Sequence, residues 1–279
     1  QMAKMQNLKE KAELYFEKNA LRYKNDYCLR NRFNPKWVRH NMILQLLEEC
    51  TPSKDSLILD AGCGPGMLSR DLVRKGYKGF GLDTSDMMIR LSKDLFKQLK
   101  REDWNFLVGD VEQTEFKKNT FDCVIASGVI EYMDEDLKML NEMNRILKPG
   151  GYLIINISNK LGYSSSLNIL TNLIKRIPYV MNLLSVIRRR ILNSEYGADN
   201  LGFTPRKHFL FTFKKSLRVS GFKVKKNISH HFSVLPAPFS TLTQGIFGNI
   251  DAKLDFLGKT PLKVFSASNL ICAKKSNEN

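Results

Sequence analysis

The sequence predicts an α/β fold: a doubly wound, mostly parallel sheet with helices on both faces. Two observations predict it. Short apolar runs recur between residues 57 and 158, several of them ending in an acidic residue, which is typical of buried strands. Stretches with apolar residues at helical spacing lie between these runs. Strands that alternate with helices build a parallel sheet through right-handed crossovers, and ligands then bind at the carboxyl ends of the strands.

Helices are expected ahead of the sheet. In residues 8–50, apolar side chains recur at helical spacing, among them Leu14, Ala20, Leu21 and Leu46. The segment is charged from its start and lacks the apolar run of a signal peptide. We therefore expect a helical segment here, and no targeting segment.

Residues 57–66 read Leu-Ile-Leu-Asp-Ala-Gly-Cys-Gly-Pro-Gly, which predicts a buried strand, a tight turn and a helix that begins near Pro65. Gly62, Gly64 and Gly66 have no Cβ, so a ligand can lie against the backbone. The helix that follows points free N–H groups at such a ligand. A nucleotide-like cofactor is expected at this turn.

The spacing of the glycines narrows the cofactor. No Lys-Ser or Lys-Thr follows them, which excludes the phosphate loop of kinases and ATPases. The dinucleotide fingerprint needs a small residue where this chain has Met67. The pattern D-x-G-x-G-x-G, which starts at Asp60, resembles motif I of the class I S-adenosylmethionine-dependent methyltransferases. A glycine turn without a ligand is the alternative.

Further motifs follow in the order of the same family. The second strand ends in Asp83, and an acid at this tip is the usual partner of ribose hydroxyls. A third strand is expected at 105–110, a fourth at 121–127, and a fifth after the turn at 147–151. Each resembles the matching methyltransferase motif. The resemblance is close over residues 53–158 and looser elsewhere.

The resemblance implies one domain, residues 1–279, on a seven-stranded sheet whose last strand is antiparallel. Its parts are a helical N-terminal cap (1–50), a cofactor-binding core (53–158), a basic helical insertion or lid after the fifth strand (159–204), and the C-terminal part of the sheet (205–279). In the core, a helix is expected from Asp134 to Ile146. In the C-terminal part we expect a helix at 206–220 and strands at 222–232 and 264–274.

The same resemblance implies S-adenosylmethionine as cofactor and S-adenosylhomocysteine as product. Asp83 should accept from the ribose hydroxyls and Asp110 from the adenine amino group, with a backbone N–H from Val111. Asp60 and the glycine loop should face the methionine part, with Ser127 nearby. The full set of expected cofactor contacts is Asp60, Gly62, Cys63, Gly64, Gly66, Asp83, Thr84, Met88, Asp110, Val111 and Ser127.

The segment after the expected fourth strand narrows the class of molecule that would accept the methyl group. Enzymes that methylate nucleic acid nitrogens often carry Asn/Asp-Pro-Pro-Tyr/Phe there, and residues 126–132 do not. They resemble the small-molecule branch, whose pattern is often Leu-Glu-His, but Tyr132 replaces the histidine. Neither a base nor a metal site carries over, and no metal is expected. The catalytic residues stay unknown, with His230, His231, Glu131 and Tyr132 as candidates.

Charge and cysteine usage suggest the setting. The chain has 44 Lys and Arg against 28 Asp and Glu, a net charge of +16, and residues 159–215 hold ten basic and two acidic side chains. Such a balance favours an anionic partner. The five cysteines are scattered without a C-x-x-C pair, so we expect a reducing, cytoplasmic setting without a disulfide framework or zinc site. No run of 18 apolar residues exists.

Two amphipathic helices are expected in the insertion, at 167–177 and 180–191, the second ending in Arg188-Arg189-Arg190. An apolar stripe with basic flanks suits a pocket lid or peripheral contact with an anionic membrane. The predicted function is methyl transfer to a small-molecule or lipid acceptor. The alternatives are methylation of RNA or protein, with nucleic acid the less favoured partner, and a non-catalytic S-adenosylmethionine-binding module. The sequence does not indicate an oligomeric state.

Overall fold

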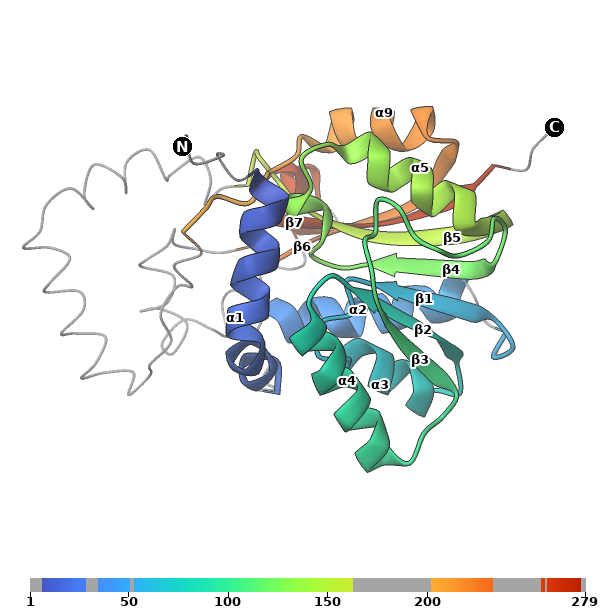
Figure 1. Ribbon diagram of the computed structural model, residues 1–279. Coiled ribbons are helices and arrows are strands. Elements are labelled where there is room, and N and C mark those ends of the chain that lie inside the picture. Colours follow the sequence, from blue (N-terminus) through green and yellow to red (C-terminus); the bar gives the residue numbers. More distant parts are fainter. Residues whose placement is uncertain are drawn as a thin grey trace, which may run out of the picture.

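A computed structural model of the chain describes residues 7–28, 35–50, 53–162, 202–232, 257–258 and 260–276. Within these residues seven strands form one sheet in the order β3-β2-β1-β4-β5-β7-β6 (Figure 1). The strands are β1 (Leu57–Ala61), β2 (Lys78–Asp83), β3 (Trp104–Val108), β4 (Phe121–Ala126), β5 (Leu147–Ser158), β6 (Phe222–His230) and β7 (Ser268–Lys275).

The directions of the strands confirm the predicted sheet. β1 to β5 pair in parallel with their neighbours. β7, the last strand, lies antiparallel between β5 and β6. The parallel part therefore brings the carboxyl ends of β1, β2 and β4 to one edge, where the strand order reverses beside β1.

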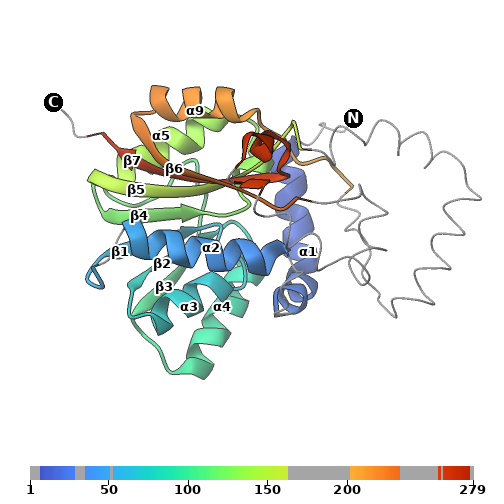
Figure 2. The same cartoon turned by 180° about the vertical axis from the view of Figure 1, so that it is seen from behind.

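Helices cover both faces of this sheet (Figures 1 and 2). One apolar cluster joins the sheet to α2, α3 and α4, and another joins it to α5 and α9. α1 stands across the carboxyl ends of the strands instead of covering a face. The helices are α1 (Leu8–Cys28), α2 (Pro35–Cys50), α3 (Met67–Arg74), α4 (Asp86–Leu99), α5 (Asp136–Ile146) and α9 (Leu210–Val219), with short 3₁₀ helices η1 (Ile130–Tyr132) and η3 (Pro261–Phe265).

The buried side of α1 differs from the predicted one. Leu14 and Leu21 are 44% and 61% exposed, whereas Ala12 and Ala20 are buried. α1 turns Ala20 toward the start of α4, where it packs with Met88. Small residues on that side let α1 approach the strand ends closely.

Two C-terminal elements begin later than predicted. The helix expected at 206–220 starts at Leu210, because the chain before it is extended: the His208 N–H donates to the Ser158 carbonyl, and the Arg206 N–H donates to the Glu131 carbonyl. The strand expected at 264–274 starts at Ser268, because residues 261–265 form η3.

Several other sequence predictions lie outside the described residues. These include the lid helices at 167–177 and 180–191 and Arg188-Arg189-Arg190.

The cysteines at 50, 63, 123 and 272 are free thiols. Among the residues that the structure describes, no helix combines the length and the apolar character needed to cross a membrane.

Candidate cofactor site

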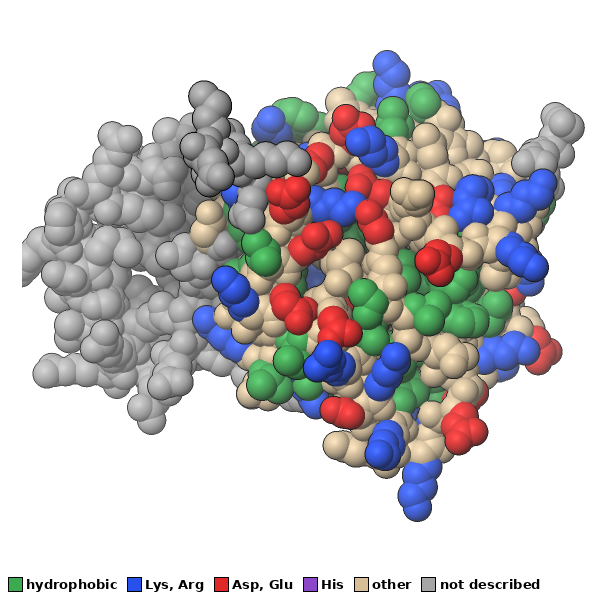
Figure 3. Space-filling model, viewed as in Figure 1, with side chains coloured by type: hydrophobic (Ala, Val, Ile, Leu, Met, Phe, Trp, Pro, Cys, Tyr) green, Lys and Arg blue, Asp and Glu red, His purple; other side chains and the backbone are tan. Residues whose placement is uncertain are grey.

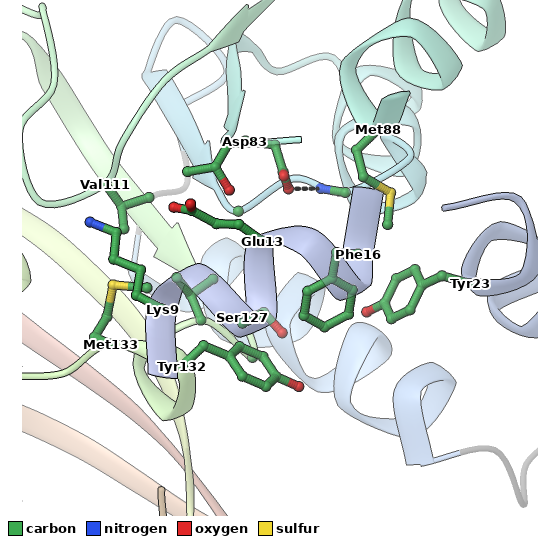
Figure 4. A pocket seen from close by; sticks show the side chains of 16 residues that line it. Lys9, Glu13, Phe16, Tyr23, Asp83, Met88, Val111, Ser127, Tyr132 and Met133 are labelled. Atoms are coloured by element: carbon green, nitrogen blue, oxygen red, sulfur yellow. Dashed lines mark hydrogen bonds between the residues drawn. The ribbon is translucent and has the colours of Figure 1, made fainter. Parts of the chain in front are cut away.

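A cavity lies at the carboxyl ends of the parallel strands, beneath α1 (Figure 4). It encloses about 650 Å³, part of it open to solvent. Phe16 and Tyr23 reach it from α1, Asp83 from the end of β2, and Ser127 from the end of β4. A second cavity of about 340 Å³ adjoins it at the glycine loop, with Gly62, Gly64, Ser127 and Tyr23 in both walls.

The glycine loop has the backbone that its sequence predicts. Gly62, Gly64 and Gly66 all have positive φ, at 73°, 52° and 74°. A Cβ on Gly62 would lie 2.3 Å from a methyl carbon of Val129, whereas one on Gly64 would meet only the Tyr23 ring, at 3.7 Å. Gly62 is therefore required by packing. Gly64 leaves open the space in which a ligand can touch the loop.

Asp83 holds the loop in place. One carboxylate oxygen accepts from the Gly64 N–H at 2.9 Å, and the other accepts from the Ser85 N–H at 3.0 Å. Burial raises the pKa of Asp83, although these backbone hydrogen bonds oppose the rise. Because each oxygen keeps a further lone pair, the carboxylate can still accept from hydroxyls in the cavity.

Asp60 lies deeper, at the end of β1, and lines the smaller cavity. It is 2% exposed, and its Oδ2 accepts from the Ser69 hydroxyl at 2.7 Å. Burial raises its pKa to about 7, although the Ser69 hydrogen bond lowers it. The charge of Asp60 at neutral pH is therefore sensitive to whatever occupies the smaller cavity.

Most of the expected cofactor residues come together at these cavities. The larger cavity is lined by Gly62, Gly64, Asp83, Thr84, Met88, Val111 and Ser127, and the smaller one by Asp60, Gly62, Cys63, Gly64 and Ser127. Gly66 and Asp110 line neither. Gly66 serves the turn into α3, as a Cβ there would lie 2.9 Å from the Ser92 hydroxyl oxygen.

Asp110 forms an ion pair instead. Lys9 of α1 reaches it at 2.5 Å and reaches Glu112 at the same distance. Acidic and basic side chains lie mixed on this face of the molecule (Figure 3). The Asp110 carboxylate thus fastens α1 beside the cavity, and its expected contact with adenine stays a prediction.

The candidates for a catalytic base separate in space. Tyr132 lines the larger cavity, and burial keeps its pKa well above the ordinary value, so its hydroxyl stays protonated. Glu131 is buried beside it: its Oε1 accepts from the Ser158 hydroxyl at 2.9 Å, and its Oε2 is buried without a hydrogen-bond partner among the described residues.

His230 and His231 lie at the end of β6 and line neither cavity. His230 is 3% exposed, and its Nε2 lies 3.1 Å from the Asn156 side-chain oxygen. Burial lowers its pKa to about 3, and the nearby Arg39 charge acts in the same direction. A histidine with this pKa is a poor proton acceptor at neutral pH.

Arg39 is the residue that the sequence analysis missed. It lies half-buried in α2, lines the smaller cavity opposite Asp60, and its Nε is buried without a hydrogen-bond partner in the described part of the chain. A Cβ on Gly128 would lie 3.3 Å from its guanidinium, which places that group beside the end of β4. A charged residue within the apolar spacing of residues 36–47 was the signal that could have identified it.

Comparison with known proteins finds similarity in the central part of the chain. Residues 59–155 match the methyltransferase domain family. An uncharacterised protein of Methanocaldococcus jannaschii is 34% identical over 115 residues, which are 41% of this chain and 46% of that protein. The human mitochondrial ubiquinone biosynthesis O-methyltransferase is 32% identical over 145 residues, 50% of this chain and 39% of the relative. The chain thus spans about half the length of the curated relatives it matches, or less.

Solved structures agree on the fold. Magnesium protoporphyrin IX methyltransferase from Synechocystis, solved with bound S-adenosylhomocysteine, superposes with a TM-score of 0.62 at 17% identity, over 95% of this chain and 98% of that chain. A Haloferax volcanii methyltransferase in complex with the Trm112 methyltransferase activator gives 0.61 at 18% identity, over 96% and 99%. The fold predicted from the sequence is confirmed, and the matched methyltransferase domain together with the S-adenosylhomocysteine-bound structure indicates S-adenosylmethionine as the cofactor.

Proposed function

We propose that this chain, which carries a class I, Rossmann-like methyltransferase domain, moves the methyl group of S-adenosylmethionine to a small-molecule or lipid-like acceptor. The observation that carries the proposal is the larger cavity. It offers backbone at Gly64, a carboxylate at Asp83, and apolar walls from Met88 and Val111. A nucleoside needs these three surfaces together: close backbone, an acceptor for its ribose hydroxyls, and an apolar slot for its base.

The smaller cavity suits the methionine part of the cofactor. Its lining includes Arg39, whose Nε is buried without a hydrogen-bond partner among the described residues, and a carboxylate is the group that a guanidinium binds best. Arg39 would hold the α-carboxylate from one side of the glycine loop while Asp83 holds the ribose from the other. Ser127 lies in both walls and would flank the point where the two parts of the cofactor meet.

The protein's task in this reaction is alignment. When bound, S-adenosylmethionine supplies a methyl group already activated by its positively charged sulfur. Phe16 and Tyr132, whose ring centroids are 5.1 Å apart, would exclude water from the reacting face. Holding the acceptor in line with the methyl carbon can contribute about 7–11 kcal/mol. A base is needed only where the acceptor must lose a proton.

Tyr132, Glu131 and His230 lack the properties of a ready base for such an acceptor. The low pKa of His230 and the raised pKa of Tyr132 argue against both at neutral pH. Glu131 lies within 2.9 Å of Ser158 and outside the cavity lining. We therefore propose an acceptor that is nucleophilic without help, or one that brings its own acidic hydroxyl.

The acceptor class rests on the relatives and on residues 126–132. The human and Coxiella burnetii relatives are both named ubiquinone biosynthesis O-methyltransferases, whose acceptors are small molecules. The chain lacks the Asn/Asp-Pro-Pro-Tyr/Phe pattern of nucleic acid enzymes. RNA or protein methylation is the alternative that the net charge of +16 favours. A module that binds the cofactor without turnover is the other.

Calorimetry with S-adenosylhomocysteine and with NAD tests the cofactor. We expect micromolar affinity for the first and no response to the second, since Met67 blocks the dinucleotide pattern. Incubation with S-adenosylmethionine carrying a labelled methyl group then tests turnover, with panels of phenols, amines, lipid extracts, RNA and peptides. Label in RNA or peptides would favour the alternative acceptors. Cofactor binding with no labelled product from any panel would favour the non-catalytic module.

A peripheral contact with an anionic membrane is the second part of the proposal. Residues 159–215 carry a net charge of +8, and Arg188-Arg189-Arg190 ends an apolar stripe. In the two described parts of this segment, residues 159–162 and 202–215, Leu161 is 49% and Phe209 is 41% exposed, with the Lys160 ammonium 4.8 Å from the Phe209 ring centre. Exposed apolar side chains beside lysines suit a membrane surface, whose interior is apolar and whose lipid headgroups are anionic.

Vesicle flotation tests this contact. The protein should bind vesicles with anionic lipids more strongly than neutral ones, and added salt should weaken the binding. Replacement of the three arginines by glutamine should abolish the difference and leave affinity for S-adenosylhomocysteine unchanged. If the unaltered protein ignores anionic vesicles at low salt, the membrane contact fails while methyl transfer stands. Salt-sensitive binding of RNA in the same assay would favour the RNA alternative.

A further inference from the structure

Three helices meet in a buried row of polar side chains behind the glycine loop. The Tyr27 hydroxyl of α1 lies 3.1 Å from Nδ1 of His40 in α2. Nε2 of His40 lies 3.2 Å from a carboxylate oxygen of Asp71 in α3. His40 has no exposed surface, and its ring lies between Tyr27 and Trp37, with centroid distances of 5.7 and 5.1 Å. Neither the fold nor the transfer of a methyl group requires such a row.

The row has a direction, because its last member can only accept. The Asp71 carboxylate also accepts from Arg70 Nε at 2.7 Å, and although burial works against it, His40 and Arg70 hold the pKa of Asp71 below its ordinary value. Nε2 of His40 is buried without a hydrogen bond among the described residues, and Asp71 is the carboxylate that lies 3.2 Å from it. The charge of Asp71 therefore favours a proton on Nε2, which leaves Nδ1 as an acceptor.

The other end of the row follows from this direction. Burial raises the pKa of Tyr27 well above the ordinary value, so the hydroxyl keeps its proton. The partner for that proton is Nδ1 of His40, at 3.1 Å. The Tyr27 oxygen then has only lone pairs left to offer, and it can accept a hydrogen bond but not donate one.

Tyr27 lines the smaller cavity together with Arg39 and Asp60. This cavity therefore holds groups of opposite preference. The guanidinium of Arg39 attracts an anion, while the acceptor oxygen of Tyr27 and the carboxyl group of Asp60 attract a donor or a cation. A ligand that satisfies both carries a carboxylate and an ammonium group close together, which is the chemistry of a free α-amino acid end.

We propose that Tyr27 accepts a hydrogen bond from the α-ammonium group of the cofactor, and that His40 and Asp71 are positioning residues that fix the Tyr27 hydroxyl as an acceptor. The inference rests on the proposed function, since it assigns the methionine end to the smaller cavity. It goes beyond it in dividing that end between two receptors: Arg39 for the carboxylate and the Tyr27–His40–Asp71 row for the amine.

Three ligands separate these roles in calorimetry: S-adenosylmethionine, its decarboxylated analogue, which keeps the amine, and methylthioadenosine, which lacks both groups. Tyr27→Phe should weaken the binding of the first two ligands on the order of tenfold, which is the effect of one lost hydrogen bond to a charged group. It should leave the affinity for methylthioadenosine unchanged. His40→Ala should give the same pattern. The double variant should add nothing to either, because both act on one contact. Arg39→Gln should weaken the binding of S-adenosylmethionine alone.

A matched control is His208→Ala. His208 is also a buried histidine beside a carboxylate, 3.0 Å from Asp136, and it lines neither cavity. It should leave all three affinities unchanged. Equal weakening of methylthioadenosine by His40→Ala would assign His40 a structural role and overturn the proposal.

Two further results would count differently. If Tyr27→Phe weakens S-adenosylmethionine and spares its decarboxylated analogue, Tyr27 donates to the carboxylate, the row runs the other way, and the proposal is overturned. If the unaltered protein binds none of the three ligands, the proposed function fails and not this inference alone.

Discussion

The two halves of the carboxyl edge of the sheet differ in how their polar groups are satisfied. At the ends of β1 and β2, Asp83 accepts from Gly64 and Ser85, and the Ser92 hydroxyl donates to the Gly64 carbonyl at 2.8 Å. At the ends of β5, β6 and β7, polar atoms are buried without a hydrogen-bond partner among the described residues. They belong to Glu131, Asn156, His230 and Asn269.

This difference indicates two kinds of site. Buried polar groups are normally paired, so the glycine loop and Asp83, which pair with each other, are fixed in shape before a ligand arrives. Beside them, Arg39 Nε is buried without a hydrogen-bond partner among the described residues, and the carboxylate of the proposed cofactor would pair with it. A side with unpaired groups still needs a partner, whether water, ligand or further chain. The first half is thus built to hold one constant molecule in one way. The second half borders the region where an acceptor would bind, and its open groups are the ones that would recognise it.

The largest expected effect tests the rigidity of the first half. Gly62→Ala should abolish binding of S-adenosylhomocysteine in calorimetry, because a Cβ there would meet Val129 at 2.3 Å and φ is 73°. The matched change, Gly64→Ala, should cost about 1–2 kcal/mol, since it adds backbone strain and meets only Tyr23 at 3.7 Å. Equal losses in the two variants would contradict a loop fixed by packing.

A second prediction concerns Asp60 and pH. Burial raises its pKa to about 7 from 3.8. Between these values the folded state keeps a proton that the unfolded state has released, so the free energy of unfolding should fall as pH rises, by about 4 kcal/mol at most. Asp60→Asn should reduce this fall in urea denaturation at pH 5 and pH 8. The exposed Asp55→Asn is the control, and an unchanged fall in Asp60→Asn would contradict the assignment.

The third prediction concerns Asp83, the proposed acceptor of the ribose hydroxyls. Asp83→Ala should weaken the binding of S-adenosylhomocysteine by about 1.5–3 kcal/mol, which is the usual loss for hydrogen bonds to a charged group. Calorimetry gives the dissociation constant. Asp86→Ala changes an exposed acid of the same region, whose partner Arg90 lies on the surface, and should have no effect. An unchanged constant in Asp83→Ala would remove Asp83 from the cofactor site.

The smallest effect on the cofactor is expected in the second half. Glu131→Gln should leave affinity for S-adenosylhomocysteine within about twofold, because Glu131 lines neither cavity. The unfolding midpoint of the variant should rise, since burial without a partner costs a neutral amide less than a carboxylate oxygen. Differential scanning calorimetry measures the second effect. A loss of affinity as large as that of Asp83→Ala would erase the distinction between the two halves.

Sequence reasoning reached further in the first half for a physical reason. Asp60 and Asp83 lie in β1 and β2, and the glycine loop follows β1 directly. A short stretch of sequence therefore predicts this part of the site. Arg39 and Tyr27 come from α2 and α1, which precede the first strand, and packing of these helices brings the two side chains to the loop. The pattern of α1 was misread because its buried side faces a cavity: small Ala12 and Ala20 are covered, while Leu14 and Leu21 are exposed.

The ion pairs of α1 have a consequence for the timing of the reaction. Lys9 holds Asp110 and Glu112, while Glu17 accepts from the Ser85 hydroxyl at 2.5 Å and from the Met87 N–H at 3.1 Å. Because this helix lies over the larger cavity, it would obstruct a cofactor that enters or leaves there. For the proposed methyl transfer, the residence time of the product would then depend on how often the helix undocks. Salt, which screens such pairs, becomes a control on turnover that acts without touching the chemical step.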